Sequence, residues 1–446
     1  MAGRPYSEDA RKAVHILFGL GALLLRFLAW WQVAAVAALA IVNNVLVLPR
    51  LAPRLFRPTD PRFAHGIVFY PLAVLGLVLV FRERLDIAAA AWGILAAGDG
   101  VGGLVGQRAG RRRLPWNAAK SVEGSAAFFL SGAAAGTALA SWCRPAAAAE
   151  PALWFSIAAP IAAALVAAFV ESMPIRLDDN ISVPAAAGGV MWTLSLIDPA
   201  GATALAGAVT AQAAPALGVN AVVAWLGWKA RTVTASGAVA GAVIGAAVVV
   251  GTGWAGWVLL LATFAAAAAT SKVGLQRKTA LGIAEARQGR RGAGNAIANT
   301  GVAAIAALLA VATASRDQAL LAFAAALAAG GSDTVASEIG KAFGRRTFIV
   351  PSLRPAPPGT PGAVSAIGTA AGLGGATALA ALAWTLGLVD GRGFVPVVAG
   401  ATAGAFAESV LGATLEGPGI VNNDVLNFLN TLIAAATAIA LWRLLP

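Results

Sequence analysis

Charged residues are scarce in this sequence. Only 12% of its 446 residues are Asp, Glu, Lys or Arg, and 59% are hydrophobic. Soluble domains carry roughly 25% charged residues. Together with a mean hydropathy of +0.77, this scarcity excludes an ordinary soluble domain and places most of the chain in lipid. The single cysteine, Cys143, excludes an internal disulfide.

Acidic residues and histidines are also few. The sequence has 20 acidic residues against 32 basic ones, a net charge of +12, and its two histidines, His15 and His65, both lie in the first half. The basic residues fall in short loops, which indicates membrane topology and phosphate binding rather than nucleic-acid recognition. We therefore expect no nucleic-acid partner. The first apolar run has no small-residue cleavage site, so we expect a retained membrane helix.

Apolar segments follow one another along the chain. We predict about fifteen transmembrane helices, hence an all-α polytopic integral membrane protein. They lie near residues 13–28, 33–48, 66–81, 85–97, 124–140, 152–170, 183–197, 213–228, 236–252, 254–270, 296–313, 318–331, 363–387, 394–412 and 425–442. Basic residues concentrate in every second loop, so we expect these loops on the cytosolic face of a bacterial cytoplasmic membrane.

One polar stretch, Gly98–Gly132, stands out from its apolar surroundings. It holds Asp99 between two glycines, then Arg111, Arg112 and Arg113, then Lys120. Glycines let backbone N–H groups approach an anion, and the basic residues add charge. We interpret the stretch as a polyphosphate-binding loop in which a bridging Mg²⁺ or Mn²⁺ accommodates the acids. The alternative is a basic cytosolic loop without a ligand.

The same spacing occurs twice. Asp99 is followed by Gly106, Gly110 and Arg111-Arg112 at the offsets at which Asp333 is followed by Gly340, Gly344 and Arg345-Arg346. Later boxes also pair: Glu123-Gly124-Ser125 with Thr360-Pro361-Gly362, Glu171-Ser172 with Glu408-Ser409, and Asp178-Asp179-Asn180 with Asn422-Asn423-Asp424. We predict two tandem modules of the same orientation, 1–197 and 213–446, joined by a linker at 198–212.

Half of the 20 acidic residues lie in or near these boxes: Asp99, Glu123, Glu171, Asp178, Asp179, Asp333, Glu338, Glu408, Glu416 and Asp424. Acids at membrane depth are costly and usually mark ion or substrate sites. Helix capping by Asp178, Asn180 or Asp333 is the alternative for single residues.

Longer boxes resemble known families. The first half resembles the phytol kinase and dolichol kinase family through Arg11-Lys12-x-x-His15, Gly98-Asp99-Gly100, Leu114-Pro115-Trp116-Asn117 with Lys120-Ser121, Glu123-Gly124-Ser125, and Glu171 through Asn180. The second half resembles the phytyl-phosphate kinase family through Gly289-Arg290-Arg291-Gly292, Asn299-Thr300-Gly301, Ser332 through Gly340, Pro357-Pro358-Gly359-Thr360 and Asn422-Asn423.

The resemblance implies a bifunctional enzyme in the membrane. One half would convert a prenyl alcohol to its monophosphate, and the other would convert the monophosphate to the diphosphate. The donor would be CTP or another nucleoside triphosphate, with Mg²⁺ or Mn²⁺. A secondary transporter and a CTP-dependent lipid cytidylyltransferase are the alternatives.

Phosphoryl transfer needs positioning and charge neutralisation. The candidate catalytic residues are Asp99, His15, Lys120, Glu123, Glu171, Asp333, Glu338 and Glu408. The candidate nucleotide or phosphate ligands are Gly98, Gly100, Arg111, Arg112, Arg113, Asn117, Ser121, Ser125, Arg290, Arg291, Arg345, Arg346, Gly359 and Thr360. The candidate metal ligands are Asp99, Asp178, Asp179, Asn180, Asp333, Asn422, Asn423 and Asp424.

The alcohol step calls for a general base, because the acceptor must lose a proton. We expect His15 in this role, with Glu171 or Asp179 as competing candidates and a purely interfacial histidine as the alternative. A phosphate monoester needs no base, so we expect Arg290 and Arg291 to recruit it in the second half.

Overall fold

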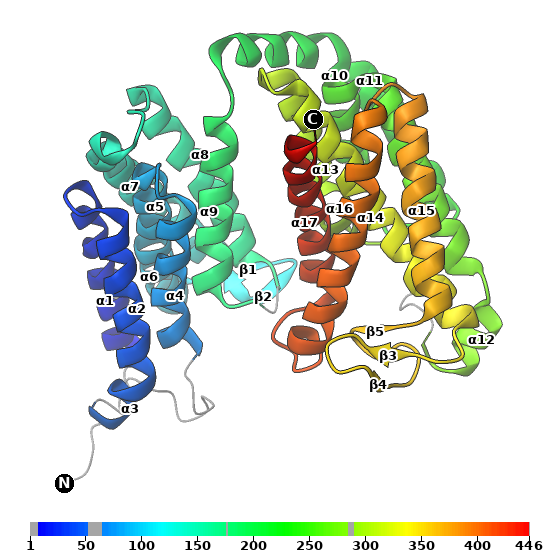
Figure 1. Cartoon of the computed structure of the whole chain (residues 1–446). Coiled ribbons are helices and arrows are strands. Elements are labelled where there is room, and N and C mark those ends of the chain that lie inside the picture. The colour runs from blue at the N-terminus through cyan, green and yellow to red at the C-terminus, as the bar shows by residue number, and fades with distance from the viewer. Residues whose placement is uncertain (1–7, 52–64, 175–176, 284–289, 446) are drawn as a thin grey trace. The chain divides into compact units, whose positions relative to one another are not determined.

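The computed structural model describes residues 8–51, 65–174, 177–283 and 290–445, and the side chains of 8–11 and 65–66 lie outside the described part. Arg11 and the His65 side chain therefore fall outside the described residues. The chain divides into two compact units, Met1–Ser195 and Leu196–Pro446. Each unit is considered by itself (Figure 1).

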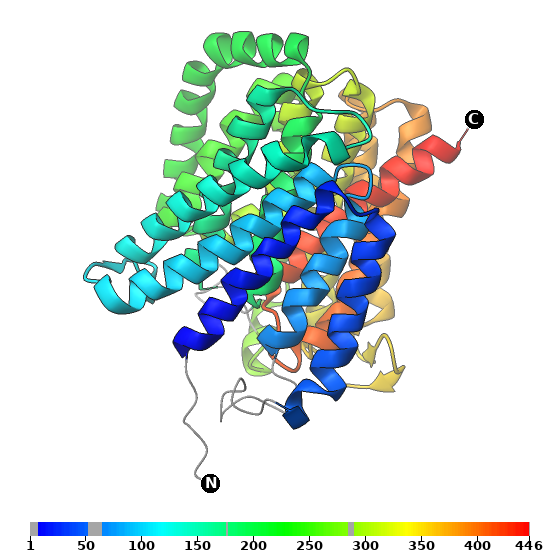
Figure 2. The same cartoon turned by 90° about the vertical axis from the view of Figure 1, so that its left-hand side faces the viewer.

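The first unit is a helix bundle with one β-hairpin. Its elements are α1 (Glu8–Gly19), η1 (Leu20–Arg26), α2 (Trp30–Leu46), α3 (Leu48–Leu51), α4 (His65–Val80), α5 (Leu85–Gly93), η3 (Ile94–Asp99), α6 (Gly100–Ala109), β1 (Arg113–Leu114), β2 (Asn117–Ser121), α7 (Val122–Cys143), η4 (Arg144–Ala146), α8 (Leu153–Ser172) and α9 (Asp179–Ser195). Helices α2 and α4 pack side by side (Figure 2).

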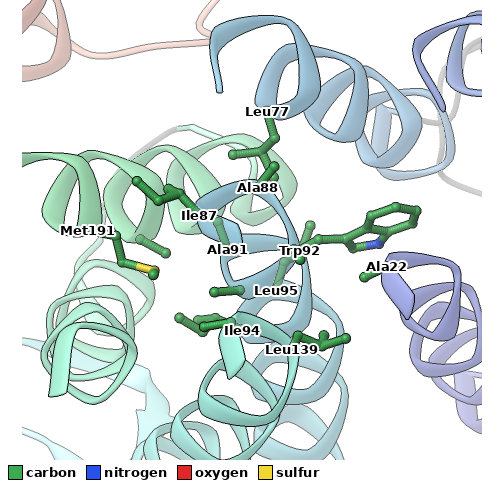
Figure 3. Packing of buried hydrophobic residues seen from close by; sticks show 14 of the residues in the cluster. Ala22, Leu77, Ile87, Ala88, Ala91, Trp92, Ile94, Leu95, Leu139 and Met191 are labelled. Atoms are coloured by element: carbon green, nitrogen blue, oxygen red, sulfur yellow. The ribbon is translucent and has the colours of Figure 1, made fainter. Parts of the chain in front are cut away.

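Helix α5 is the centre of this bundle. Every one of its residues is buried, as expected of a helix that is hydrophobic on all sides. Ile87 and Leu95 lie among side chains from three other elements, represented by Leu77 of α4, Leu139 of α7 and Met191 of α9 (Figure 3). The packing fixes the helix that leads directly into Asp99.

A π-helical turn, Ile94–Asp99, joins α5 to α6 without a break. The helical run therefore extends from Leu85 to Ala109, and the predicted loop at Gly98–Gly132 is helical up to Ala109 and again from Val122. The reason is close packing: a Cβ on Gly102 would lie 2.8 Å from Phe128 Cβ and 3.1 Å from the Gly124 carbonyl oxygen. Such small residues let membrane helices approach closely.

The second unit is also helical. Its elements are α10 (Pro199–Lys229), α11 (Ala235–Lys272), α12 (Leu275–Ala280), α13 (Ala293–Ala312), α14 (Arg316–Phe343), β3 (Phe348–Ile349), β4 (Arg354–Pro355), β5 (Ala363–Val364), α15 (Ala366–Thr385), α16 (Gly391–Leu411), η6 (Gly412–Glu416) and α17 (Asn423–Leu444). The short strands form an antiparallel sheet in the order β4-β3-β5. Helix α14 is the buried centre, packed against α13, α15, α16 and α17.

Helix α11 consists of two limbs. Gly253 has φ 69° and ψ −167°, a non-helical conformation that favours glycine, and the helix is kinked at this residue. These limbs correspond to the two spans predicted at 236–252 and 254–270.

The all-α membrane fold is confirmed, with differences in detail. Among the described residues, ten helices are long and apolar enough to cross a membrane, and Trp30–Leu46 and Ile67–Val80 are shorter apolar helices. The prediction of about fifteen spans therefore exceeds the number of long helices, because it also counted short segments and both limbs of α11. Residues 198–212, the predicted linker, are helical in the structure: Asp198 caps α10, and the helix continues from Pro199 to Lys229.

Candidate phosphotransfer site

Asp99 ends the π-helical turn and faces α1. Its Oδ2 atom lies 2.7 Å from Lys12 Nζ and 3.5 Å from His15 Nε2. Lys12 and His15 are three residues apart, which places them on one face of α1. Helix α1 comes this close because Gly100 has no side chain: a Cβ there would lie 2.4 Å from Ile16 Cγ1.

The imidazole of His15 is held from both sides. Its ring contacts the Tyr70 ring edge-on at 4.5 Å between centroids, and the Tyr70 hydroxyl accepts a 2.7 Å hydrogen bond from Trp92 Nε1. His15 Nε2 lies 3.4 Å from the Leu95 carbonyl oxygen as well as near Asp99. Since both neighbours are acceptors, this nitrogen carries the proton.

The β1–β2 hairpin brings a second lysine to the site. Lys120 Nζ donates to Glu171 at the end of α8 and lies 3.5 Å from Asp179 Oδ2 at the start of α9. Burial opposes its positive charge, yet Asp179 and Glu171 outweigh burial and raise the pKa of Lys120 above its usual value. Burial raises the pKa of Asp179 to about 6, although Lys120 acts in the opposite direction.

Three carboxylates converge here. Asp99, Glu171 and Asp179 each offer an oxygen atom within 4.8 Å of the others. Together with Lys12 and Lys120 they leave one net negative charge, and hard carboxylate oxygens are the ligands that Mg²⁺ prefers. We call Lys12, His15, Asp99, Lys120, Glu171 and Asp179 the Asp99 cluster. Its donor set fits a divalent metal ion.

Two further predicted residues, Asn117 and Ser121, together with Trp116, hold the hairpin and the start of α7 in place. Asn117 Nδ2 donates to the Ser172 carbonyl oxygen at 3.1 Å, and Trp116 Nε1 donates to Ser172 Oγ at 3.2 Å. These bonds hold the hairpin against the end of α8, next to Glu171. Ser121 caps α7, because its Oγ accepts from the Gly124 amide.

Other predicted residues contribute no side chain to the Asp99 cluster. Glu123 accepts hydrogen bonds from the Arg111 and Arg112 amides and so closes the turn before β1. Asp178 accepts from the Asn180 amide, as the capping alternative expected. Arg111, Arg112 and Arg113 are exposed. Gly98 packs against Phe128 and Gly100 against Ile16. Ser125 lies in the first turn of α7, where its buried Oγ has no hydrogen-bond partner.

In the second unit, the carboxyl groups of Asp333 in α14 and Glu408 in α16 lie close enough to interact. Asn430 Nδ2 donates to Glu408 Oε2 at 2.7 Å, while Asn430 Oδ1 is buried and has no hydrogen-bond partner. Lys341 and Arg291 are close enough to act electrostatically on Asp333. The structure thus brings together Asp333, Glu408 and Arg291 from the predicted set.

Glu338 follows Asp333 by five residues in α14 but has different partners. Lys278 Nζ lies 2.5 Å from its Oε2 and Lys341 Nζ lies 3.0 Å from its Oε1, and both Glu338 and Lys278 are almost completely buried. The remaining predicted residues lie elsewhere in the second unit. Arg290 has a buried Nε atom without a hydrogen-bond partner, Asn422 caps α17, and Asp424 lies beside Gly294. The side chains of Asn423, Arg345 and Arg346 are exposed, and Gly359 and Thr360 belong to a turn that begins at Pro357.

The two units share one local arrangement. A Cβ on Gly110 would meet the Gly106 carbonyl oxygen and Ser121 Oγ, and a Cβ on Gly344 would meet the Gly340 carbonyl oxygen and Ser365 Oγ. Ser365 caps α15 as Ser121 caps α7. The helix start that corresponds to Ser121 is therefore Ser365, not the Thr360-Pro361-Gly362 box that the sequence suggested.

Sequence reasoning did not assign site roles to Lys12, Lys278, Lys341 or Asn430. Only Lys12 carried a usable signal, because the Arg11-Lys12-x-x-His15 box places Lys12 and His15 on one helix face. The others depend on contacts between helices that are distant in sequence.

Comparison with known proteins gives relatives for parts of the chain. An uncharacterized membrane protein of Synechocystis sp. is 40% identical over 182 residues, which is 40% of this chain and 70% of that protein. Protein VTE6, chloroplastic, of Arabidopsis thaliana is 33% identical over 187 residues, 40% of this chain and 56% of that protein. Probable phytol kinase 2, chloroplastic, of Glycine max is 30% identical over 187 residues, 40% of this chain and 62% of that protein.

The chain thus spans little more than half the length of the two plant relatives. No solved structure matches it. The family model described as "Integral membrane protein DUF92" matches residues 218–435. That match and the extent of the Synechocystis similarity show that the chain belongs to the DUF92 family of integral membrane proteins.

Proposed function

We propose that this protein is a membrane isoprenoid kinase with two sites. The first unit phosphorylates a prenyl alcohol, and the second phosphorylates the resulting monophosphate. The donor is a nucleoside triphosphate, CTP by preference, and both sites face the cytosol. The name of the phytol kinase relative supports the class of reaction.

The observation that carries the two-site proposal is the position of the carboxylates. Asp99 lies seven residues before Gly106, and Asp333 lies seven residues before Gly340, in the matched helix pairs described above. Each aspartate has a glutamate beside it, Glu171 in the first unit and Glu408 in the second. This recurrence supports two tandem modules, each with its own acidic centre.

In the first unit the residues divide the chemistry between them. Asp99, Glu171 and Asp179 would hold Mg²⁺, which neutralises phosphate charge when bound. Lys120 lies beside the carboxylates as a point charge for the transferred group. His15 Nε2 already points at two acceptors, so the structure favours the competing candidates for the base. Asp179 is the more exposed of those two carboxylates, so its second oxygen, the one that would not hold the metal ion, is the more accessible to an alcohol.

In the second unit no base is required, because a phosphate monoester is already anionic. Asp333 and Glu408 supply carboxylate oxygens, and Lys341 and Arg291 supply positive charge close to them. Attraction of two anionic substrates needs such cations.

The test is product analysis of the full chain in membranes with a prenol and nucleotide labelled in the γ-phosphate. We expect Asp99→Asn to abolish monophosphate formation but to leave conversion of added monophosphate to diphosphate, and Asp333→Asn to do the reverse. Loss of both steps in either variant would show one composite site. A cytidine-bearing lipid product would show a nucleotidyltransferase, and substrate flux without phosphorylated product would show a transporter.

A further inference from the structure

A cavity of about 150 Å³ lies in the second unit between α10, α11 and α13. Its walls are mainly apolar, with Val223 of α10, Ile244, Leu260 and Phe264 of α11, and Ala296 of α13 among the lining residues. Glycines at positions 227, 237 and 241 make room between the helices. An apolar cavity with few polar groups suits a hydrocarbon chain.

One end of the cavity is polar. Arg291, Asn295 and Asn299 line it there, around the start of α13. Gly330 of α14, three residues before Asp333 on the same helix, also lines the cavity and packs against Asn299, and Gly294, next to Asn295, lies against the Asp424 carboxylate. The polar end of the cavity is therefore beside the acidic centre of the second unit.

The other end is closed by a satisfied polar pair. Trp257 Nε1 donates to Asn220 Oδ1 at 3.0 Å, and Asn220 Nδ2 donates to the Ala216 carbonyl oxygen at 2.9 Å. Because these groups bond one another, this end presents little unsatisfied polarity to a ligand. From Trp257 to Ala267 the lining extends over ten residue steps of α11, or about 15 Å along the helix.

The cavity borders an exposed apolar surface of α10 and α11. Only 11% of the most apolar window of α10 is buried within the protein, and the lining residue Gly241 is exposed. A Cβ built on Gly241 would meet no atom within 4 Å. A chain already in the bilayer could therefore enter from the side, between α10 and α11.

We propose that this cavity binds the isoprenoid chain of a prenyl monophosphate and holds its phosphate at Arg291, next to Asp333 and Glu408. This inference rests on the proposed function and adds the place where the lipid substrate binds. The positive end selects an anionic head over an alcohol, and the apolar walls do not suit a free nucleotide. The Asn220–Trp257 pair limits how far the chain extends.

The test is a binding measurement that involves no turnover. The full chain in lipid nanodiscs, without nucleotide, is photolabelled with geranylgeranyl monophosphate that carries a diazirine at the end of the chain. We expect labelled peptides to contain Asn220 or Trp257. We also expect Gly241→Phe to weaken binding at least about tenfold by filling the cavity, with a smaller effect on geranyl monophosphate.

Gly218→Phe is the matched control. Gly218 also lies on an exposed helix face with no atom within 4 Å of a built Cβ, but it does not line the cavity. Equal effects of the two substitutions, labelling outside α10, α11 and α13, or displacement of the probe by phospholipid as readily as by monophosphate would overturn the inference. Specific labelling without any kinase activity would instead support the cavity and reject the proposed function.

Discussion

Lys12 Nζ lies 2.7 Å from Asp99 Oδ2 and 3.2 Å from the Asp99 carbonyl oxygen, so one ammonium group holds both the side chain and the backbone at the end of the π-helical turn. Both side chains are largely buried, at 9% and 14% exposure. Removal of one partner from a buried ion pair leaves an uncompensated charge and costs about 3–5 kcal/mol.

We therefore expect Lys12→Met to lower the free energy of unfolding of the first unit by that amount in mixed micelles. Lys12→Met/Asp99→Asn should recover most of the loss. The exposed pair Arg82 and Glu83 provides the control, since Arg82→Met should change stability by less than about 1 kcal/mol. Similar losses in the single and double variants would show that the ion pair is unimportant.

Metal binding in the first unit should depend on pH. Because the folded-state pKa of Asp179 is raised to about 6, this carboxyl is protonated at pH values where an ordinary aspartate is still ionised. We expect Mg²⁺ affinity to be constant above about pH 7 and to fall up to about tenfold per unit below pH 6, as one proton competes with the metal ion. Titration calorimetry of the full chain measures this dependence.

Asp179→Asn should remove the pH dependence and weaken Mg²⁺ binding at pH 7. The stability of the fold and the affinity for Mg²⁺ depend on pH in opposite directions. The folded state holds this proton more tightly than the unfolded state, so ionisation of Asp179 reduces stability as pH rises towards 6. If Mg²⁺ affinity depended on pH in the same way in Asp179→Asn, the titrating group would be a residue other than Asp179.

The two predicted catalytic glutamates of the first unit should behave differently. Glu171 lies in the Asp99 cluster, whereas Glu123 bonds the Arg111 and Arg112 amides. We expect Glu171→Gln to lower kcat of the alcohol step by about 100-fold or more, and Glu123→Gln to retain it within about threefold. A large effect of Glu123→Gln on kcat, with the fold intact by circular dichroism, would show that the turn at Arg111 and Arg112 is part of the active site.

The buried pair Lys278–Glu338 should stabilise the second unit without taking part in chemistry. Lys278→Met is expected to cost about 3–5 kcal/mol in the unfolding of the unit, and Lys278→Met/Glu338→Met to recover much of it. The recovered double variant should still phosphorylate monophosphate. A stable but inactive double variant would make Glu338 catalytic, as the sequence suggested.

Because α6 packs closely on α7, a larger side chain between these helices should lower the stability of the first unit. Gly102→Val should destabilise the first unit by about 1–3 kcal/mol, because Phe128 and Gly124 occupy the space. Gly76 of α4 has no atom within 4 Å of a built Cβ, so Gly76→Val should be tolerated. Equal responses at both glycines would rule out tight α6–α7 packing.

The sequence predicted the helical membrane class well because hydropathy is a local property. Asp99, Lys120, Glu171 and Asp179 were all named as candidates, and the structure brings them together. The offset from Asp99 to Gly106 recurs from Asp333 to Gly340, and the two tandem modules inferred from it stay a prediction.

Other features required three-dimensional contacts. Glycines between Gly98 and Gly110 were interpreted as a phosphate-binding loop, but their composition is equally typical of closely packed membrane helices. The helix start at Gly124 was paired with Gly362, whereas the packing pairs it with Gly368. Neither distinction is contained in residue spacing, because both depend on which helix lies opposite.

The π-helical turn Ile94–Asp99 determines the directions in which the side chains of α6 point relative to those of α5. A helix advances by about 100° per residue, and a π turn contains one residue more than the α-helical turn it replaces. Deletion of Ala97 would therefore rotate α6 by about that angle relative to α5. Asp99 would turn away from Lys12, and the glycines that face α7 would be replaced by side chains. For this reason, natural sequences with this fold should vary in residue type along Ile94–Ala97 more readily than in length.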